Sequence, residues 1–441
     1  MAGWNDLPVE LFVKILEDLE HTRQWSRLAR TSRGIYNFVN PLLYHRFADN
    51  AYTRAARAGN DLTLHRALSY NAPLDGGRIL CIAAESGHAN IVSALLAINT
   101  DIESRNANTF TPLELAVVGG HAAVARVLLN AGANTSPRRK EYTTVQNYDG
   151  TLLPYAAREN NIDVVAALLE SGRVNVNEAD TILDSTALNE ALSHNVNAPM
   201  AEMLLRAGAD PNTLFQFQQS ALGFVISDTD AQVNEDQRVA LVKMLLSHGA
   251  DINRPASNPP LRDAIQSRHP IGYLSPFQTL LDQANLNVNY AGIEDDTGLT
   301  DAIRYNKWMM ARVLLEKRAD LDVNKGNPMV EAIRKGRVPL AREIIATGRL
   351  NALAYRAALE QAISQRGVSG NLMVNYLLRA LVCSGLLGGG EVKRELGALL
   401  ELAEKVGNKV ARGYVQDWIE KSETGSGLDE SGGNKLWSGS F

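Results

Sequence analysis

Residues 109–136 read TFTPLELAVVGGHAAVARVLLNAGANTS, and this stretch decides the fold. A first helix is predicted to begin after Thr111, which can cap a helix N-terminus, and Pro112 suits the first helical position because its missing N–H needs no partner there. Glu114 completes a capping box with Thr111. A Gly-Gly pair ends this helix, and a second amphipathic helix runs up to Gly132, which favours the left-handed conformation of a helix end.

The same helix–turn–helix pattern recurs along the chain. Paired aliphatic residues come before a turn, at steps of 33, 40, 36, 41, 35, 34 and 30 residues. These pairs are Leu95-Leu96, Leu128-Leu129, Leu168-Leu169, Leu204-Leu205, Leu245-Leu246, Leu280-Leu281, Leu314-Leu315 and Ile344-Ile345. One such unit cannot bury both of its faces, so it needs a copy on each side. The period therefore predicts an all-α stack of about nine units over residues 49–351.

These units resemble the ankyrin repeat, most closely in TPLELA…GGHAAVARVLLNAGA and AAESGHANIVSALL. Tetratricopeptide repeats share the period, but not the Thr-Pro-Leu cap or the Leu-Leu-x-x-Gly-Ala turn. The resemblance implies an α-solenoid with short hairpin fingers, in which the repeats after residue 213 are degenerate. Residues 352–421 are expected to form a helical C-terminal cap, and residues 422–441 a flexible tail.

Composition excludes several classes of protein. The 441 residues carry a net charge of −5, which argues against general nucleic-acid binding because that needs a basic excess. Two distant cysteines indicate a reducing compartment and not a disulfide scaffold. The sequence shows no signal peptide and no apolar run of about 18 residues or more, so we expect no membrane contact and a cytoplasmic and/or nuclear location.

The segment before the repeats has an excess of apolar residues. Residues 7–19, LPVELFVKILEDL, predict a helix that is apolar on more than one side, which exceeds a single buried stripe. Residues 4–47 predict three short helices, close to the lower size limit for independent folding. Their excess apolar surface needs a partner, either the repeat stack or another protein.

This segment resembles the F-box. The match runs through Leu7-Pro8, Glu10, Ile15-Leu16, Leu19, Leu28, Ser32-Arg33, Tyr36 and NPLLYHRF, and we place the domain at residues 1–48. It departs from the family where Trp25 replaces the usual aliphatic residue and Tyr36 the frequent Trp. The resemblance implies docking on the Skp adaptor of cullin–RING ubiquitin ligases. By position, the expected adaptor contacts are Leu7, Pro8, Leu11, Ile15, Leu16 and Leu28. The alternative is that these residues only pack against the first ankyrin unit.

A surface for a target protein is expected on the repeats, because ankyrin stacks bind through their hairpin tips and inner helices. The first helices of two late repeats end in basic residues, which predicts an acidic segment in the partner; ordinary solvated charge is the alternative. The inserted loop at residues 137–150 and an aromatic residue at a fingertip are further candidates. The candidate residues are Phe110, Tyr142, Arg304, Tyr305, Arg334 and Lys335.

Sequence signals of catalysis are missing. There is no P-loop, no G-x-S-x-G elbow and no zinc-ligand spacing, so we expect no cofactor and no metal. His88 and His121 are predicted to hold the turns between helices, and Cys81 and Cys383 to be packed thiols. The carboxylates are expected at caps and on surfaces, with no pair singled out.

Three functional hypotheses follow. The first is a non-catalytic substrate-recognition subunit of a Skp–cullin–F-box ubiquitin ligase, similar to F-box–ankyrin proteins that are abundant in filamentous fungi. The second is an ankyrin scaffold whose F-box-like segment only caps the stack. The third, an enzyme with a site in the degenerate C-terminal part, is supported by no motif.

Overall fold

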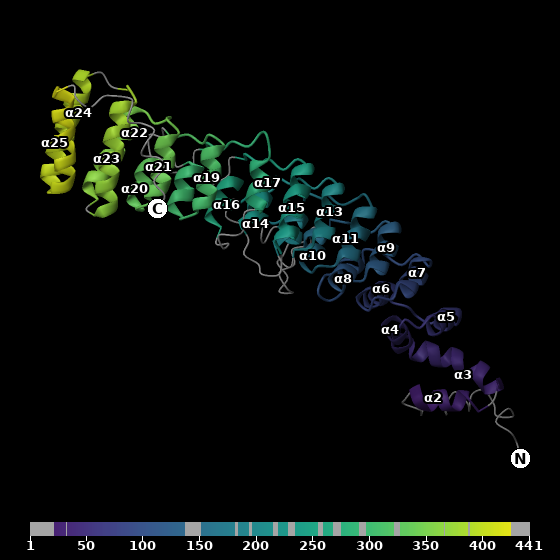
Figure 1. The fold of residues 1–441 in the computed structure, drawn as a ribbon. Coiled ribbons are helices and arrows are strands. Elements are labelled where there is room, and N and C mark those ends of the chain that lie inside the picture. The colour runs from purple at the N-terminus through teal and green to yellow at the C-terminus, as the bar shows by residue number, and fades with distance from the viewer. Residues whose placement is uncertain are drawn as a thin grey trace, which may run out of the picture. The chain divides into compact units, whose positions relative to one another are not determined.

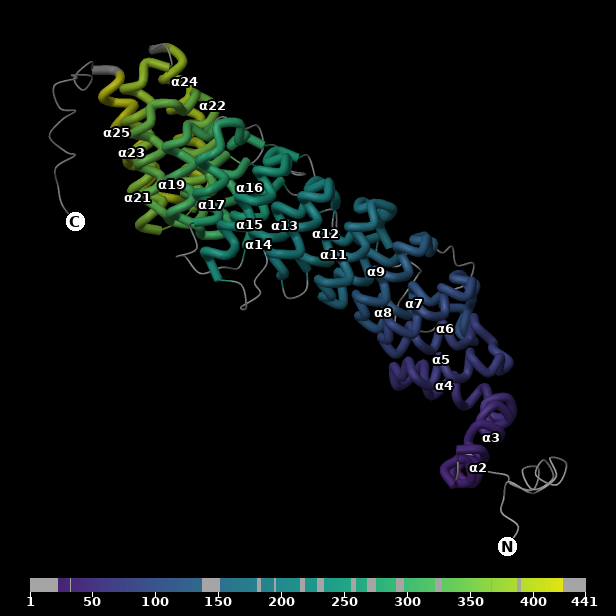
Figure 2. The backbone as a smooth tube through the Cα atoms, turned by 90° about the vertical axis from the view of Figure 1, so that its right-hand side faces the viewer, coloured from purple at the N-terminus to yellow at the C-terminus, as the bar shows by residue number. Residues whose placement is uncertain are grey.

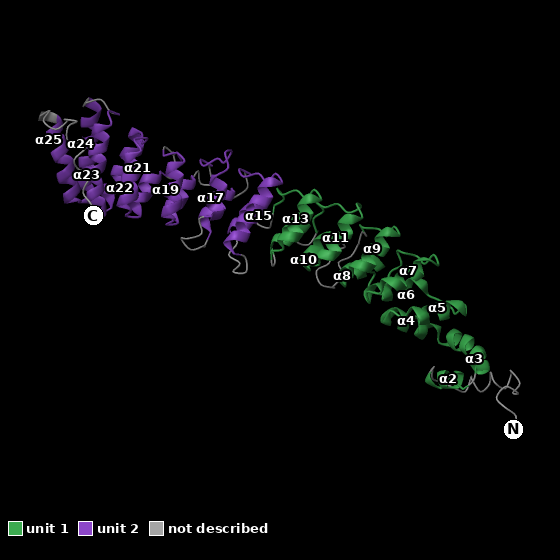
Figure 3. Ribbon diagram, turned by 45° about the vertical axis from the view of Figure 1, so that its right-hand side comes forward, with its two compact units in different colours: residues 1–216 green, residues 217–441 purple. Residues whose placement is uncertain are grey.

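The computed structural model describes residues 22–31, 33–136, 151–180, 184–193, 196–214, 219–227, 234–254, 259–267, 275–290, 297–321, 327–365, 367–386 and 389–424. The chain divides into two compact units, residues 1–216 and 217–441 (Figure 3). Within the described ranges every regular element is a helix, and β-type pairing is confined to isolated bridge residues, such as the antiparallel pair Ala179 and Thr186. The all-α prediction is therefore confirmed (Figure 1).

The described residues of the first unit form two N-terminal helices and five helix pairs. The N-terminal helices are α2 (Thr22–Ala29) and α3 (Arg33–Arg46). The pairs are α4 (Ala48–Ala58) with α5 (Asp61–Ser69), α6 (Gly76–Glu85) with α7 (Ala89–Leu96), α8 (Pro112–Val118) with α9 (Ala122–Asn130), α10 (Leu152–Arg158) with α11 (Ile162–Glu170), and α12 (Ala187–Ser193) with α13 (Ala198–Arg206). The first helices of successive pairs pack on one another in one row, and the second helices in another (Figure 2).

The pair α8–α9 shows how the sequence makes one unit. The Thr111 hydroxyl accepts from the Glu114 N–H at 3.3 Å, and the Glu114 carboxylate accepts from the Thr111 N–H at 2.7 Å. The predicted capping box is therefore confirmed. In α9, Val124 and Leu128 are fully buried, and each such side chain contributes about 1.5–3 kcal/mol. A short helix of this kind is held mainly by its packed face.

Hydrogen bonds between repeats align neighbouring units. His88 Nε2 lies 2.9 Å from the Arg57 carbonyl oxygen, and His121 Nε2 lies 3.0 Å from that of Glu85. Both histidines precede a second helix and bond to the repeat before them, which confirms their predicted structural role at the turns. Such bonds fix the register of a stack in which each unit contacts only its neighbours.

The second unit continues the same two-row arrangement with longer helices at its end. Its helices are α14 (Ala221–Ser227), α15 (Glu235–Ser247), α16 (Pro260–Gln266), α17 (Ser275–Leu281), α18 (Gly298–Arg304), α19 (Trp308–Glu316), α20 (Pro328–Arg334), α21 (Val338–Ala346), α22 (Ala352–Ser364), α23 (Val368–Cys383), α24 (Gly389–Val406) and α25 (Lys409–Thr424). Helix α22 packs on α20 and α24 on α22, while α23 packs on α21 and α25 on α23. The C-terminal helices thus extend both rows by two pairs. Residues 422–424 of the expected tail belong to α25, and the rest of it lies outside the described residues.

The N-terminal helices differ from the expected pattern. The first predicted helix, residues 7–19, lies outside the described residues. Residues 24–39, which the sequence predicts as one helix, are divided between α2 and α3, because α2 ends before Thr31, whose hydroxyl donates to the Leu28 carbonyl at 2.7 Å. Helix α3 then continues through Pro41. The half-buried Pro41 gives up one intrahelical hydrogen bond there, while Ile35 and Val39 on the same helix stay buried.

Candidate functional site

A small apolar cluster joins α2 and α3. Its buried members are Trp25, Ala29, Ile35 and Val39, and partly buried around them lie Leu28, Tyr36, Phe38, Leu42, Leu43 and Phe47. The Trp25 and Phe47 rings meet edge to face, with 5.7 Å between their centroids. Of the six expected adaptor contacts, only Leu28 is among the described residues, where it packs on the rim of this cluster. Leu7, Pro8, Leu11, Ile15 and Leu16 lie outside them.

The C-terminal end of α3 is attached to the first helix pair. The rings of Tyr44 and Tyr70 lie 5.4 Å apart, and His45 Nε2 is 2.8 Å from the Tyr70 carbonyl oxygen. Burial is the main cause that raises the pKa of Tyr44 above its usual value. The N-terminal helices therefore connect to the repeats through packed side chains as well as through the backbone.

The prediction that Phe110 is an exposed fingertip anchor is wrong. Its side chain is buried, with 3% of the residue exposed. The finger turns earlier, at Asn106 and Thr109: the Thr109 N–H donates to the Asn106 carbonyl, and the Asn106 side chain accepts from the Phe110 N–H at 2.9 Å. Phe110 thus leads directly into α8, where its ring is covered. Tyr142, the other aromatic candidate, lies outside the described residues.

The other four candidate partner residues, three of them basic, lie at the ends of first helices. Arg304 and Arg334 are the last residues of α18 and α20, and Tyr305 and Lys335 follow as C-caps. Each first helix of seven residues is about 10 Å long, so these side chains sit about that far from the fingers that precede the helices. The candidates therefore belong to the turns within the helix pairs and not to the hairpin tips.

The two arginines are held by acids of their own helices. Arg334 Nη1 lies 2.8 Å from a Glu331 carboxylate oxygen, and Arg304 Nη1 lies 3.6 Å from Asp301. Both acids are buried, whereas 58% of the Arg334 side chain and 33% of the Arg304 side chain are exposed. The carboxylates thus orient the guanidinium groups without covering them.

The two cysteines differ in their surroundings. Cys81 is buried, as predicted, and its burial raises the pKa of the thiol to about 11, which keeps it protonated near neutral pH. Cys383 was expected to be packed, but it is exposed. The buried face of α23 runs from Gly370 to Leu381, and Cys383 falls outside this stripe.

A buried polar network in the second unit was missed by the sequence reasoning. Arg262 Nε lies 3.0 Å from Asp301 Oδ2, and the Tyr290 hydroxyl donates to the same oxygen at 3.1 Å. Asp263 beside them is 4% exposed, and burial raises the pKa of its carboxyl to about 7. The acids in the first turns of these helices are visible in the sequence, but the sequence predicts carboxylates at helix caps and on surfaces and singles out no buried pair.

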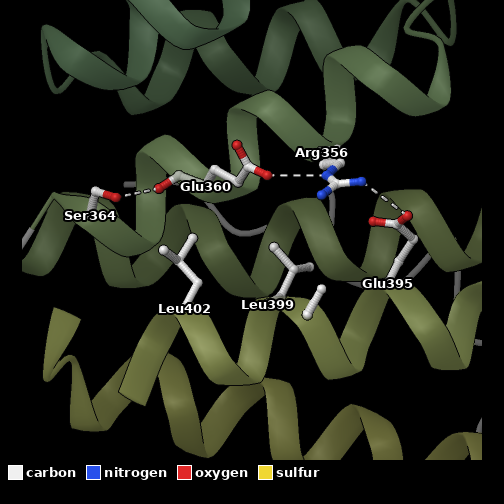
Figure 4. A pocket seen from close by; sticks show the side chains of 7 residues that line it. Arg356, Glu360, Ser364, Glu395, Leu399 and Leu402 are labelled. Atoms are coloured by element: carbon white, nitrogen blue, oxygen red, sulfur yellow. Dashed lines mark hydrogen bonds and ion pairs between the residues drawn. The ribbon is translucent and has the colours of Figure 1, made fainter. Parts of the chain in front are cut away.

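A cavity of about 300 Å³ lies between α22 and α24 (Figure 4). Its polar side is one arginine between two acids: Arg356 Nε is 3.0 Å from Glu360, and its Nη1 is 3.3 Å from Glu395. Leu399 and Leu402 line the apolar side. Both carboxylates are paired with Arg356, so they do not form a pair of acid and base for catalysis. The cavity is an amphipathic groove, polar on one side and apolar on the other.

Two kinds of site are absent from the described ranges. No cluster of three or more His, Cys, Asp or Glu side chains there could hold a metal ion. No helix in the same part of the chain combines the length and apolar character needed to cross a membrane.

Comparison with known proteins assigns families to three stretches. Residues 4–49 match the F-box-like family, residues 52–139 match ankyrin repeats (3 copies), and residues 153–205 match ankyrin repeats (many copies). The potassium channel AKT2/3 of Arabidopsis thaliana is 31% identical over 131 residues, which are 30% of this chain and 15% of the channel. The chain therefore corresponds to a small part of that relative.

Similar solved structures are ankyrin repeat domains. That of Bcl-3, described as a unique member of the IkappaB protein family, is 23% identical with a TM-score of 0.43, covering 53% of this chain and 97% of its own. Human ASB11 gives 21% identity, a TM-score of 0.38 and coverage of 52% and 96%. An ankyrin repeat domain from Acinetobacter baumannii AYE is 21% identical with a TM-score of 0.38, covering 46% of this chain and 95% of its own.

Proposed function

We propose that this chain, an F-box-like segment followed by ankyrin repeats, is a non-catalytic substrate-recognition subunit of a Skp–cullin–F-box ubiquitin ligase. The F-box-like segment would dock on a Skp-type adaptor and through it on a cullin, and the repeats would hold a target protein. Such a receptor acts by raising the effective concentration of its target near the conjugating enzyme. It would work in the cytoplasm, the nucleus or both.

The observation that carries the proposal is the order of the two families along the chain. The F-box-like match ends at residue 49, and the ankyrin match begins at residue 52. The first match includes all six expected adaptor contacts, and α3 packs directly on α4 and α5. A docking segment fixed to the first repeat would present a bound target at a constrained distance from the adaptor.

The α2–α3 cluster adds physical support. Only four of its side chains are buried, while six large apolar ones around them are partly exposed. Apolar surface of this kind gains roughly 25 cal/mol per Å² when a partner covers it. Residues 7–19 and an adaptor together would provide that cover.

Co-purification tests the proposal. The full chain is expressed with a Skp-type adaptor, beside the Ile15→Asp/Leu16→Asp variant. We expect the wild type to retain the adaptor and the variant to lose it. The matched control, Leu62→Asp/Leu353→Asp, changes leucines that are 60% and 75% exposed on α5 and α22, and it should bind as the wild type does. Adaptor binding by the Ile15/Leu16 variant at wild-type level would refute the docking proposal.

A second candidate function is an ankyrin scaffold whose N-terminal segment only caps the stack. The contacts of Tyr44 and His45 with Tyr70 favour it, because they already cover part of α3. The two functions differ in the behaviour of the chain alone. A scaffold should be a soluble monomer, whereas a receptor with an uncovered docking helix should aggregate until the adaptor is added.

A further inference from the structure

Four turns line one edge of the second unit. Each joins the first and second helix of one of its last four pairs: residues 304–309, 334–339, 365–370 (residue 366 lies outside the described ranges) and 407–412. We call this set the turn edge.

Contacts between the turns make them a continuous surface. The Arg337 guanidinium stacks on the Trp308 ring at 4.3 Å, which joins the first turn to the second. The Gln365 side chain reaches the Arg334 carbonyl at 3.5 Å, which joins the second to the third. Asn408 Nδ2 donates to the Ile363 carbonyl at 2.9 Å and so fixes the fourth turn against the helix that precedes the third.

The turn edge carries charge of one sign. Its described residues include no acid, and its basic residues are Arg304, Lys307, Arg334, Lys335, Arg337, Lys409 and Arg412. Three acids lie just outside it and pair with its arginines: Asp301 at 3.6 Å from Arg304, Glu331 at 2.8 Å from Arg334, and Glu404 at 3.4 Å from Arg412. The corresponding turns of the first unit, residues 57–62, 85–90, 118–123 and 158–163, hold the bases Arg57 and Arg158 and the acids Asp61, Glu85, Glu159 and Asp163. The basic excess therefore belongs to this part of the chain and not to the repeat as such.

Large apolar side chains stand exposed between the cations. Tyr305 and Met309 are each 44% exposed, Val410 is 49% exposed, and Val368, at the start of α23, is 77% exposed. Single exposed apolar residues are normal on protein surfaces. Four of them on one basic edge are what an amphipathic acidic partner would cover.

We propose that the turn edge binds an acidic segment of the target protein that also carries apolar side chains. This inference rests on the proposed function and names the chemistry of the target. The carboxylates of the segment would pair with Lys335, Arg337 and Lys409, and its apolar residues would cover Met309 and Val368. The buried acids Asp301 and Glu331 contribute by holding Arg304 and Arg334 in place from beneath.

A peptide fits this edge better than a nucleic acid does. The whole chain has a net charge of −5, which repels a long polyanion. The Trp308 ring on the edge already stacks with Arg337, and of the four exposed apolar residues only Tyr305 offers an aromatic face on which a base could stack.

Fluorescence anisotropy with the full chain tests the inference. The probe is a labelled twelve-residue peptide of Glu with two Phe and two Leu, and its reference is the same peptide with Gln in place of every Glu. The test variant is Lys335→Glu/Lys409→Glu. The control, Arg54→Glu/Lys243→Glu, makes the same charge change at exposed sites elsewhere on the repeats.

We expect the wild type to bind the Glu peptide more tightly than the Gln peptide, and less tightly as salt increases. Two lost ion pairs and two new repulsions at about twofold each should together weaken the binding of the Glu peptide to the test variant about 16-fold, with binding to the control unchanged. Any of four results would overturn the inference. The two peptides could bind equally, or the two variants could weaken binding equally. The chain could fail to bind the Glu peptide at low salt, or it could bind single-stranded DNA of the same charge more tightly than the peptide. Adaptor co-purification of the test variant at wild-type level separates such a failure from a failure of the proposed function.

Discussion

The buried carboxyl of Asp263 gives a prediction that can be worked out in numbers. Asp263 lies on α16, and burial raises its pKa from 3.8 to about 7. The groups that face it are Gln219, which donates a hydrogen bond, and Arg262, whose charge lowers the pKa only in part. Asp301 on α18 holds that arginine at 3.0 Å, so the attraction of Arg262 is shared between two acids.

The sign follows from linkage. A carboxyl whose folded pKa lies above its unfolded pKa contributes fully to stability below about pH 4, and this contribution is lost as the pH rises through about 7. For a pKa of 3.8 in the unfolded chain and about 7 in the folded chain, the unfolding free energy lost relative to low pH is about 4 kcal/mol at pH 8 and about 1.7 kcal/mol at pH 5. The Asp263→Asn variant removes this loss, so it should gain about 2.5 kcal/mol over the wild type between pH 5 and pH 8.

Urea unfolding of the full chain at pH 5 and pH 8 measures this difference. The control is Asp236→Asn, which makes the same substitution at an exposed position on α15 of the same unit. If the gap between Asp263→Asn and the wild type were the same at pH 5 and at pH 8, Asp263 would not be a buried group that titrates near neutral pH, and the reasoning would be refuted.

Three further predictions concern stability. Gly223→Ala should lower the free energy of unfolding by about 1–3 kcal/mol, because the added Cβ would overlap Asp263 Oδ2. In an Asp263→Ala background the same change should raise the free energy of unfolding by about 0.5–1 kcal/mol, since alanine favours a helix over glycine. Urea midpoints that shift equally in both backgrounds would contradict this. Arg158→Ala should cost about 3–5 kcal/mol in chemical unfolding, since Asp180 and Glu190 would keep their buried charges without it; a loss below about 1 kcal/mol would show that they do not depend on it. Thr111→Ala should cost about 0.5–2 kcal/mol and Thr111→Ser almost nothing, as measured by thermal unfolding, because Ser keeps the cap; equal losses would argue against the capping box.

The parts of the fold that depend on local chemistry could be predicted from the sequence. The capping box of Thr111 and Glu114 involves residues three apart, and the roles of His88 and His121 follow from their place before a second helix. Paired aliphatic residues recur at a regular step along the chain, so the stack could be expected from its period alone.

Long-range packing explains what the sequence did not show. Arg262, Tyr290 and Asp301 come from different helices and loops, and nothing in their spacing shows that they meet in a buried network. The burial of Phe110 depends on where the finger turns, and the exposure of Cys383 on which face of α23 meets its neighbours. The candidate partner residues at the basic turns were found by charge, but their separation from the fingertips required the structure.

Assembly with purified components tests the central claim most directly. The full chain, a Skp-type adaptor and a cullin are mixed in pairs and together, and the masses of the complexes are measured by size-exclusion chromatography with light scattering. The account predicts that the chain joins the cullin only when the adaptor is present, in a complex with one copy of each. A folded chain that stays monomeric in the complete mixture, or that binds the cullin without the adaptor, would contradict it.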